Sequence, residues 1–153
     1  MKKGFTLVEL LVVIAIISLL ASIVLSSIRT SQTEGSDTAK IRALQEVRSA
    51  LELYRTSNGG YPGGSSSTLA SFLVPKYISS VDANLLYQGT DSSNQNTCAT
   101  APCVSYHLGI PLSLTNNKVL LIDKDINVGF DGTKDNCISG TASVPDLCYD
   151  IVP

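Results

Sequence analysis

Apolar residues are concentrated at the start of the chain, in a run that extends from Phe5 to Ile28. Between Leu10 and Ile28 no residue is charged, and serine is the only polar residue type. A helix of these roughly 19 residues, with a rise of about 1.5 Å each, is close in length to the ~30 Å hydrocarbon thickness of a bilayer. Lys2 and Lys3 precede the run, and such positive flanks stay on the cytoplasmic side. The pattern predicts a transmembrane helix whose N-terminus is cytoplasmic.

A second pattern starts at Asp37 and predicts an amphipathic helix. Apolar residues recur there at steps of three and four, which places them on one face: Ile41, Leu44, Val47, Leu51 and Tyr54. Asn58-Gly59-Gly60 predicts the end of this helix. The polar stretch 29–36 contains Gly35, which weakens a helix by about 1 kcal/mol, so we expect a kink or a frayed turn there. Together the two patterns indicate one helix of about 80 Å from Phe5 to Ser57.

The C-terminal half reads as short strands. Residues 104–110 alternate between apolar and small or polar side chains, which predicts a half-buried strand. Turn-forming residues 115–118 lie between apolar stretches 112–114 and 119–122 and predict a hairpin. We also expect a short helix over 68–74, a short strand at 85–87 and a last strand over 148–152. The predicted fold class is α+β, a long N-terminal helix packed on an antiparallel sheet of three or four strands.

Glu9 is the one acid inside the apolar run, and it needs an explanation. A carboxylate at mid-membrane costs about 2.5–3.5 kcal/mol, so it usually has a partner. Three interpretations compete. A secretory signal peptide has an apolar region of about 7–15 residues, shorter than this run. A plain membrane anchor leaves Glu9 unexplained. Cleavage between Gly4 and Phe5 creates a new amine that a neighbouring copy could bring to Glu9 when the apolar helices bundle.

The junction Lys3-Gly4-Phe5 followed by Thr-Leu-Val-Glu9-Leu resembles the leader junction of type IV prepilins and type II secretion pseudopilins. The resemblance implies that a membrane prepilin peptidase cuts after Gly4 and N-methylates Phe5. It also implies that Glu9 is the glutamate required for assembly. The resemblance covers residues 1–28, extends more weakly to Pro62, and is architectural beyond. Many members carry a proline near the position of Ser26, and this chain has none there.

On this resemblance the chain divides into a leader peptide (1–4), a transmembrane and filament-core helix (5–28), an amphipathic helix (29–60), a connecting region (61–103), and a sheet with a disulfide-stapled end (104–153). The implied function is a structural filament subunit of a type IV pilus or a type II secretion pseudopilus. Its implied partners are other pilin copies, the prepilin peptidase, an inner-membrane assembly platform and, before assembly, membrane lipid. The implied location is the bacterial inner membrane, then a surface pilus or a periplasmic pseudopilus.

Two questions stay open at this stage. The first is which filament the chain builds. The Gly60-Tyr61-Pro62 helix end and the acidic loop at residues 123–135 favour a pseudopilin. The connecting region and two small loops closed by the expected disulfides favour a surface pilin. The alternative from another class is a membrane-anchored extracytoplasmic binding domain that never polymerises. Such a domain gains nothing from Glu9.

All four cysteines lie late in the chain, at Cys98, Cys103, Cys137 and Cys148. Four cysteines allow three connectivities. A zinc site has poor spacing here, because there is no C-x-x-C and the chain has one histidine, His107. An export signal with an even cysteine count favours disulfides. We expect the sequence-local pairs Cys98–Cys103 and Cys137–Cys148.

Composition and motifs exclude several function classes. A net charge of -2 with 16% charged residues provides no basic footprint for nucleic acid. The chain contains no nucleophile elbow, P-loop or dinucleotide fingerprint, so we expect no enzyme. His107 is interpreted as a surface or sheet residue.

One cluster of oxygen ligands is visible, formed by Asp123, Asp125, Asp131 and Asp135. It half-matches a calcium loop, but Lys134 stands where an EF-hand needs a glutamate. The resemblance to pseudopilins, which bind calcium in a C-terminal loop, implies a calcium site of another type. The alternative is a set of acidic turns that solubilise a loop.

Overall fold

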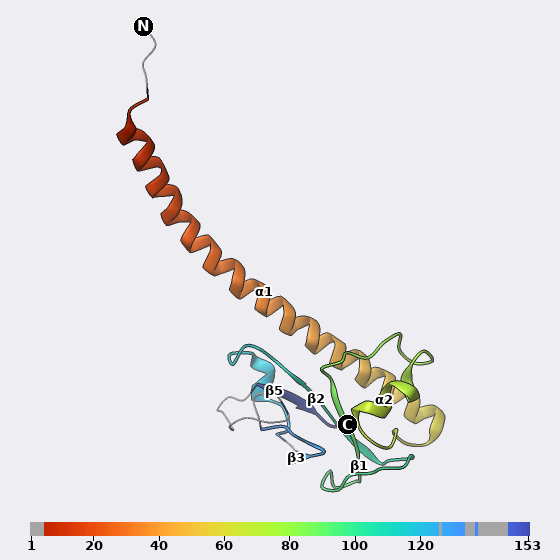
Figure 1. Ribbon diagram of the computed structural model, residues 1–153. Helices are drawn as coiled ribbons and strands as arrows, with labels where there is room; N and C mark the ends of the chain where they lie inside the picture. Colours follow the sequence, from red (N-terminus) through yellow and green to blue (C-terminus); the bar gives the residue numbers. More distant parts are fainter. Residues whose placement is uncertain (1–4, 126, 134–136, 138–146) are drawn as a thin grey trace. The chain divides into compact units, whose positions relative to one another are not determined.

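The computed structural model describes residues 5–125, 127–133, 137 and 147–153 (Figure 1). The chain divides into two compact units, Met1–Ser36 and Asp37–Pro153, of which we call the second the head. The elements follow in this order: α1 (Leu7–Asn58), α2 (Ser66–Leu73), β1 (Leu86–Thr90), β2 (Ser105–Pro111), the 3-10 helix η1 (Lys118–Leu121), β3 (Asn127–Val128), β4 (Phe130–Asp131) and β5 (Cys148–Ile151). The α+β class predicted from the sequence is confirmed.

The first unit contains the apolar part of α1. This helix is long and apolar enough to cross a membrane, judged by its length and composition. α1 continues as helix through Gly35, so the frayed turn expected at residues 29–36 is absent, and the kink stays a prediction. The helix ends at Asn58, and Gly59 follows with a φ of 78°, a left-handed conformation that glycine adopts without strain.

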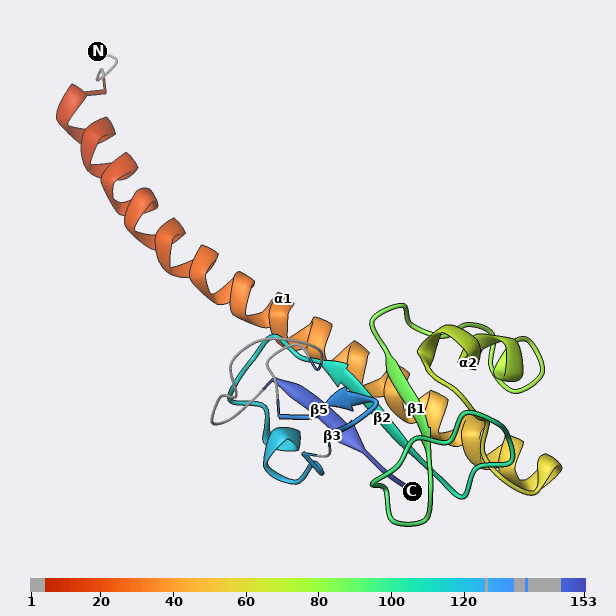
Figure 2. The ribbon, with the colours of Figure 1, turned by 60° about the horizontal axis from the view of Figure 1, so that its bottom comes forward.

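In the head, residues 37–58 of α1 bury the predicted apolar stripe against a three-stranded antiparallel sheet of order β1-β2-β5 (Figure 2). Strand β2 is central: Tyr87 of β1 lies opposite Leu108, and Tyr149 of β5 lies opposite Ile110. Helix α2 covers the last turns of α1, where the Tyr54 ring meets Phe72 edge-on at 6.0 Å between centroids. This layer of helix on sheet forms one core, because each element alone leaves an apolar face uncovered.

Strand β2 differs from the half-buried strand that its alternation predicts. Ser105 through Ile110 are all buried, so both faces of the strand are covered. The second face is covered by Phe130 of β4, whose ring stacks on the His107 ring with centroids 3.7 Å apart. Gly109 permits this approach, since a Cβ there would lie 2.6 Å from a Phe130 ring carbon. A distant two-stranded ribbon therefore buries the residues that looked solvent-facing in the sequence.

The hairpin expected over 112–122 is wrong. The second half of this segment forms η1, and the Asn117 side chain accepts the Val119 N–H at its start. The first half is held by α1, because the Asp37 carboxylate accepts the N–H groups of Ser113 and Leu114. Backbone donors occupied in this way are lost to a strand ladder. Residues 115–118 were correctly predicted to form a turn, but contacts with distant residues produced a turn other than a hairpin.

The other short elements lie close to their predicted positions. Helix α2 spans Ser66–Leu73 and stops one residue before Val74, which precedes Pro75. The strand expected at 85–87 is β1, shifted toward the C-terminus, and the last strand is β5.

Candidate functional site

The residues at the proposed cleavage junction lie at the start of α1. Gly4 lies outside the described residues, and Phe5 precedes the helix with an exposed side chain. Thr6 and Glu9 cap the helix reciprocally: the Glu9 Oε2 accepts the Thr6 N–H at 2.8 Å and the Thr6 hydroxyl at 2.7 Å, and the Thr6 Oγ1 accepts the Glu9 N–H at 3.3 Å. This is a capping box. Its sequence signal, threonine followed three residues later by glutamate, was present and overlooked.

The apolar surface of residues 5–28 has no partner within the described chain. Its large apolar side chains expose 45–78% of their surface. A contiguous apolar patch of this size marks a membrane or protein interaction site. Two serines add little polarity, because Ser18 donates to the Ile14 carbonyl at 2.7 Å and Ser22 to the Leu19 carbonyl at 2.8 Å. The surface can therefore be covered either by lipid or by other apolar helices.

The four cysteines form two disulfides, Cys98–Cys103 with an S–S distance of 2.02 Å and Cys137–Cys148 with 2.07 Å. These are the sequence-local pairs expected above. The loop 98–103 is joined to the segment that leaves α1, because Tyr61 and Cys103 exchange two backbone hydrogen bonds of 2.8 and 2.9 Å. The Gly64 N–H also donates to the Cys98 carbonyl at 2.9 Å. Backbone hydrogen bonds thus connect the loop that the first disulfide closes to the segment that follows the long helix.

The structure brings together only part of the acidic cluster that the sequence predicts. One carboxylate oxygen from each of Asp123, Asp125 and Asp150 lies within 4.8 Å of the others. Asp131 is engaged elsewhere, since its Oδ1 accepts the N–H and hydroxyl of Thr133. Asp135 lies outside the described residues. Asp150 joins the group from β5, and sequence reasoning missed it because it is distant along the chain. Calcium binding therefore stays a prediction.

Asp150 is held by a buried contact with His107. Both side chains are fully buried, and the His107 Nε2 lies 2.6 Å from the Asp150 Oδ2. The His107 Nδ1 lies 3.0 Å from the Val128 carbonyl oxygen, which only accepts, so Nδ1 carries a proton. The sheet position expected for His107 is confirmed, while its short contact with the Asp150 carboxylate was not anticipated.

The other Asp150 oxygen, Oδ1, accepts the backbone N–H groups of Lys124 and Asp125 at 3.1 and 3.0 Å. A single buried carboxylate thus fastens the exposed acidic segment to the sheet beneath it. The arrangement is a structural anchor: neither ring nitrogen of His107 is exposed to a substrate.

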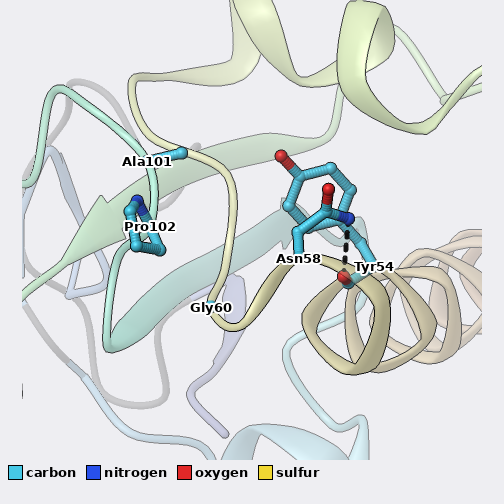
Figure 3. A pocket seen from close by; sticks show the side chains of 5 residues that line it. All are labelled: Tyr54, Asn58, Gly60, Ala101 and Pro102. Atoms are coloured by element: carbon cyan, nitrogen blue, oxygen red, sulfur yellow. Dashed lines mark hydrogen bonds between the residues drawn. The ribbon is translucent and has the colours of Figure 1, made fainter.

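A pocket of about 210 Å³ lies at the end of α1 (Figure 3). The residues that line it are Tyr54, Asn58, Gly60, Ala101 and Pro102. The Asn58 amide donates to the Tyr54 carbonyl at 2.8 Å and to the Tyr77 hydroxyl at 3.2 Å, so it closes the helix end. The lining of this pocket includes no charged side chain, thiol or imidazole. The Tyr54 hydroxyl is the one group of this lining that could transfer a proton, and the lining supplies no base beside it.

Buried tyrosines occupy the centre of the head. Tyr61 and Tyr106 meet edge-on at 4.8 Å, and Tyr87 stacks on Tyr106 at 6.2 Å. Burial raises the pKa of the Tyr87 and Tyr106 hydroxyls far above that of free tyrosine. They stay neutral core residues, and the Tyr87 hydroxyl donates to the Pro62 carbonyl at 2.6 Å.

Comparison with known proteins adds a family context to this geometry. Residues 1–25 match the family model described as the prokaryotic N-terminal methylation motif. The chain is 29% identical to the type IV wide pilus major component PilA4 of Thermus thermophilus, over 65% of this chain and 72% of the relative. It is 32% identical to a fimbrial protein of Neisseria meningitidis serogroup B, over 54% of this chain and 50% of the relative.

The chain is also 33% identical to type II secretion system core protein G of Pectobacterium carotovorum, over 40% of this chain and 39% of the relative. The alignments with the last two relatives thus span half of their lengths or less. No solved structure matches the chain. The motif and the relatives support the pilin and pseudopilin family, whose members named here are structural components and not enzymes.

Proposed function

We propose that this chain, similar to type IV pilins and type II secretion pseudopilins, is a prepilin-like subunit cut after Gly4 and N-methylated at Phe5. The processed chain assembles into a filament through the apolar helix of residues 5–28. The observation that carries the proposal is Glu9, an acid at the start of a helix whose large apolar side chains are 45–78% exposed. In a membrane anchor this acid would only cap its own helix through Thr6, whereas a bundle of processed copies also supplies it with an amine.

The energetics of assembly follow from the change of surroundings. Moving an apolar helix from lipid into a bundle gains no hydrophobic free energy, because lipid tails are as apolar as leucine. Packing and charge compensation must therefore provide the drive. The Glu9 Oε2 is occupied by Thr6 of its own chain, which leaves Oε1 to accept a neighbour's N-terminal amine. A head-to-tail contact that repeats with a rotation and a rise produces an open fibre.

The proposal includes the partners and location of such a subunit. Before assembly the chain lies in the inner membrane with its N-terminus in the cytoplasm, where the peptidase and the assembly platform act on it. The relatives comprise both pilus components and a secretion component. Filaments on the cell surface would identify a pilus subunit, and filaments confined to the periplasm a pseudopilus subunit.

Intact mass of the chain from its host's envelope tests the processing step. We expect loss of Met1–Gly4 and gain of one methyl group on Phe5. A chain lacking roughly its first 20–28 residues would identify an ordinary signal peptide. A full-length mass would favour the membrane-anchored binding domain.

Electron microscopy of filaments from Glu9 variants tests the assembly step. Glu9→Gln keeps an oxygen that caps Thr6 but removes the charge, and Glu9→Ala removes both. We expect both variants to reach the membrane and to form no filaments. Thr6→Ala is the matched control: it loses the two hydroxyl hydrogen bonds of the cap, keeps the charge and should retain filaments. Wild-type filament numbers in Glu9→Gln would refute the charge-compensation role.

A further inference from the structure

The head exposes an uncovered apolar pair, Leu121 and Ile122, each with 77% of its surface accessible. The pair is presented by an ordered turn. Buried Leu120 anchors this turn in the core, and the Ile122 N–H donates to the Val119 carbonyl at 3.2 Å. Exposed Leu and Ile side chains held in one place mark a contact surface more strongly than scattered single residues do.

The residues that follow are equally well held. The N–H groups of Lys124 and Asp125 donate to the buried Asp150 carboxylate, while both side chains are exposed. The segment Leu121–Asp125 therefore has a backbone fastened to the sheet and exposes Leu121, Ile122, Lys124 and Asp125, whereas Asp123 is half-buried. It combines an apolar pair with one positive and two negative charges.

A hollow of about 320 Å³ lies on the flank of α1 in the same head. Ile41, Arg42, Gln45, Glu46 and Ser49 line it. Ile41 and the methylene stems of the longer side chains form an apolar floor, because long polar side chains keep only their ends in water. Arg42 and Glu46 stand one helical turn apart and are exposed.

The charges of the two surfaces complement one another. Within the part of the chain that the structure describes, Arg42, Glu46 and Lys124 take part in no ion pair. Lys124 can therefore face Glu46, while Asp125 faces Arg42. Exposed pairs of this kind contribute little affinity each, but they select the partner and its register.

We propose that the Leu121–Asp125 segment of one copy docks in the α1 hollow of a second copy, with Lys124 against Glu46. This inference rests on the proposed function, since a filament brings many heads together. Each head carries one of each surface, so in a filament the contact can repeat head to tail from copy to copy. Such a repeated contact extends the fibre.

Cross-linking of the full-length chain in filaments from its host tests the contact. The variant Glu46→Cys/Lys124→Cys is treated with a bismaleimide, which joins two nearby thiols. We expect a ladder of covalent dimers and larger species. Each single variant, and the control pair Glu46→Cys/Lys76→Cys, should remain monomeric. Lys76 is exposed in the turn after α2 and lies outside the proposed contact.

Charge reversal provides a second readout. Glu46→Lys and Lys124→Glu should each lower filament number several-fold, and the double reversal should restore it. The control Lys118→Glu should leave it unchanged. Wild-type filament numbers in both reversals together with no ladder would overturn this contact and leave the proposed function intact. Absence of filaments from the unmodified chain would overturn both.

Discussion

The Asp37 carboxylate accepts the backbone N–H of Ser113 through both of its oxygens, each at 3.0 Å, and that of Leu114 at 2.9 Å. Asp37 is fully buried and is the first residue of the head. Lys40 reinforces it, with its Nζ 3.8 Å from an Asp37 oxygen and 2.8 Å from the Pro111 carbonyl oxygen. The start of the amphipathic helix is thereby fastened to the end of β2.

Removal of the Asp37 carboxylate should destabilise the head. We expect Asp37→Ala to lower the free energy of unfolding by about 2–3 kcal/mol, because hydrogen bonds to a charged group are lost and the Ser113 and Leu114 donors lose their partner. Asp37→Asn keeps one accepting oxygen and should cost less. Denaturant unfolding of the full chain in detergent micelles measures the change. Lys118→Ala, at an exposed residue, is the control, and an equal loss in both would contradict the role of Asp37.

Leu51 and Leu53 form a matched pair for the helix–sheet core. Leu51 is fully buried and Leu53 is 57% exposed, two residues away on the same helix. Leu51→Ala should cost about 2–5 kcal/mol, the range for a buried leucine that leaves a cavity. Leu53→Ala should change stability by less than about 0.5 kcal/mol. Similar melting temperatures for the two variants would show that this stripe does not form the core.

The Cys98–Cys103 bridge should stabilise the connecting region despite its short loop. Loop-closure entropy predicts that Cys98→Ser/Cys103→Ser lowers the free energy of unfolding by about 2 kcal/mol. Removing the Cys137–Cys148 bridge, which closes a longer loop, should lower it by more. Denaturant midpoints of the two double variants provide the comparison. Thr100→Ala, which keeps both bridges, is the control. The reverse order of losses would contradict the entropy account.

Asp91 should titrate at unusually low pH. Hydrogen bonds to the ionised carboxylate, first from the Asn96 side chain at 2.6 Å and then from Ser93, hold its pKa below the ordinary aspartate value. Because the pKa of Asp91 is depressed in the folded state, these hydrogen bonds contribute stability to the fold at pH values above the ordinary aspartate pKa. That stability is lost as the pH falls through the folded-state pKa. Carboxyl NMR of Asn96→Ala should show the midpoint rising toward the ordinary value. Asn84→Ala, which removes a donor to Asp82, should leave it unchanged.

A calcium titration can test whether the carboxylates that lie together in the structure form the binding site. Asp123 and Asp125 lie in one group with Asp150, whereas Asp131 is bonded to Thr133. We expect calorimetry on the full chain to show a calcium signal that Asp123→Asn abolishes and Asp131→Asn retains. Equal loss in both variants would contradict this grouping. No heat and no thermal shift with the unmodified chain would end the calcium proposal.

Sequence patterns that depend on neighbouring residues could be interpreted without knowledge of the tertiary structure. The apolar run, the stripe from Ile41 to Tyr54 and the glycines after Asn58 correctly predicted the long helix, its buried face and its end. The sequence-local cysteine pairs also match the disulfides of the structure. In each case the determining contacts lie within a few turns of helix or one short loop, so spacing along the chain carries the information.

Relationships between distant segments appeared only in the tertiary structure. The sequence by itself determined an apolar helix with one acid, an amphipathic helix and short antiparallel strands. The fold decided that Phe130 covers β2 and that Asp37 diverts the segment after β2 from a hairpin. It also decided that Asp150, which contacts His107, anchors the acidic loop by accepting two of its backbone N–H groups. The reason is physical: a buried polar group takes whichever partner packing brings to it, and that partner can lie anywhere along the chain.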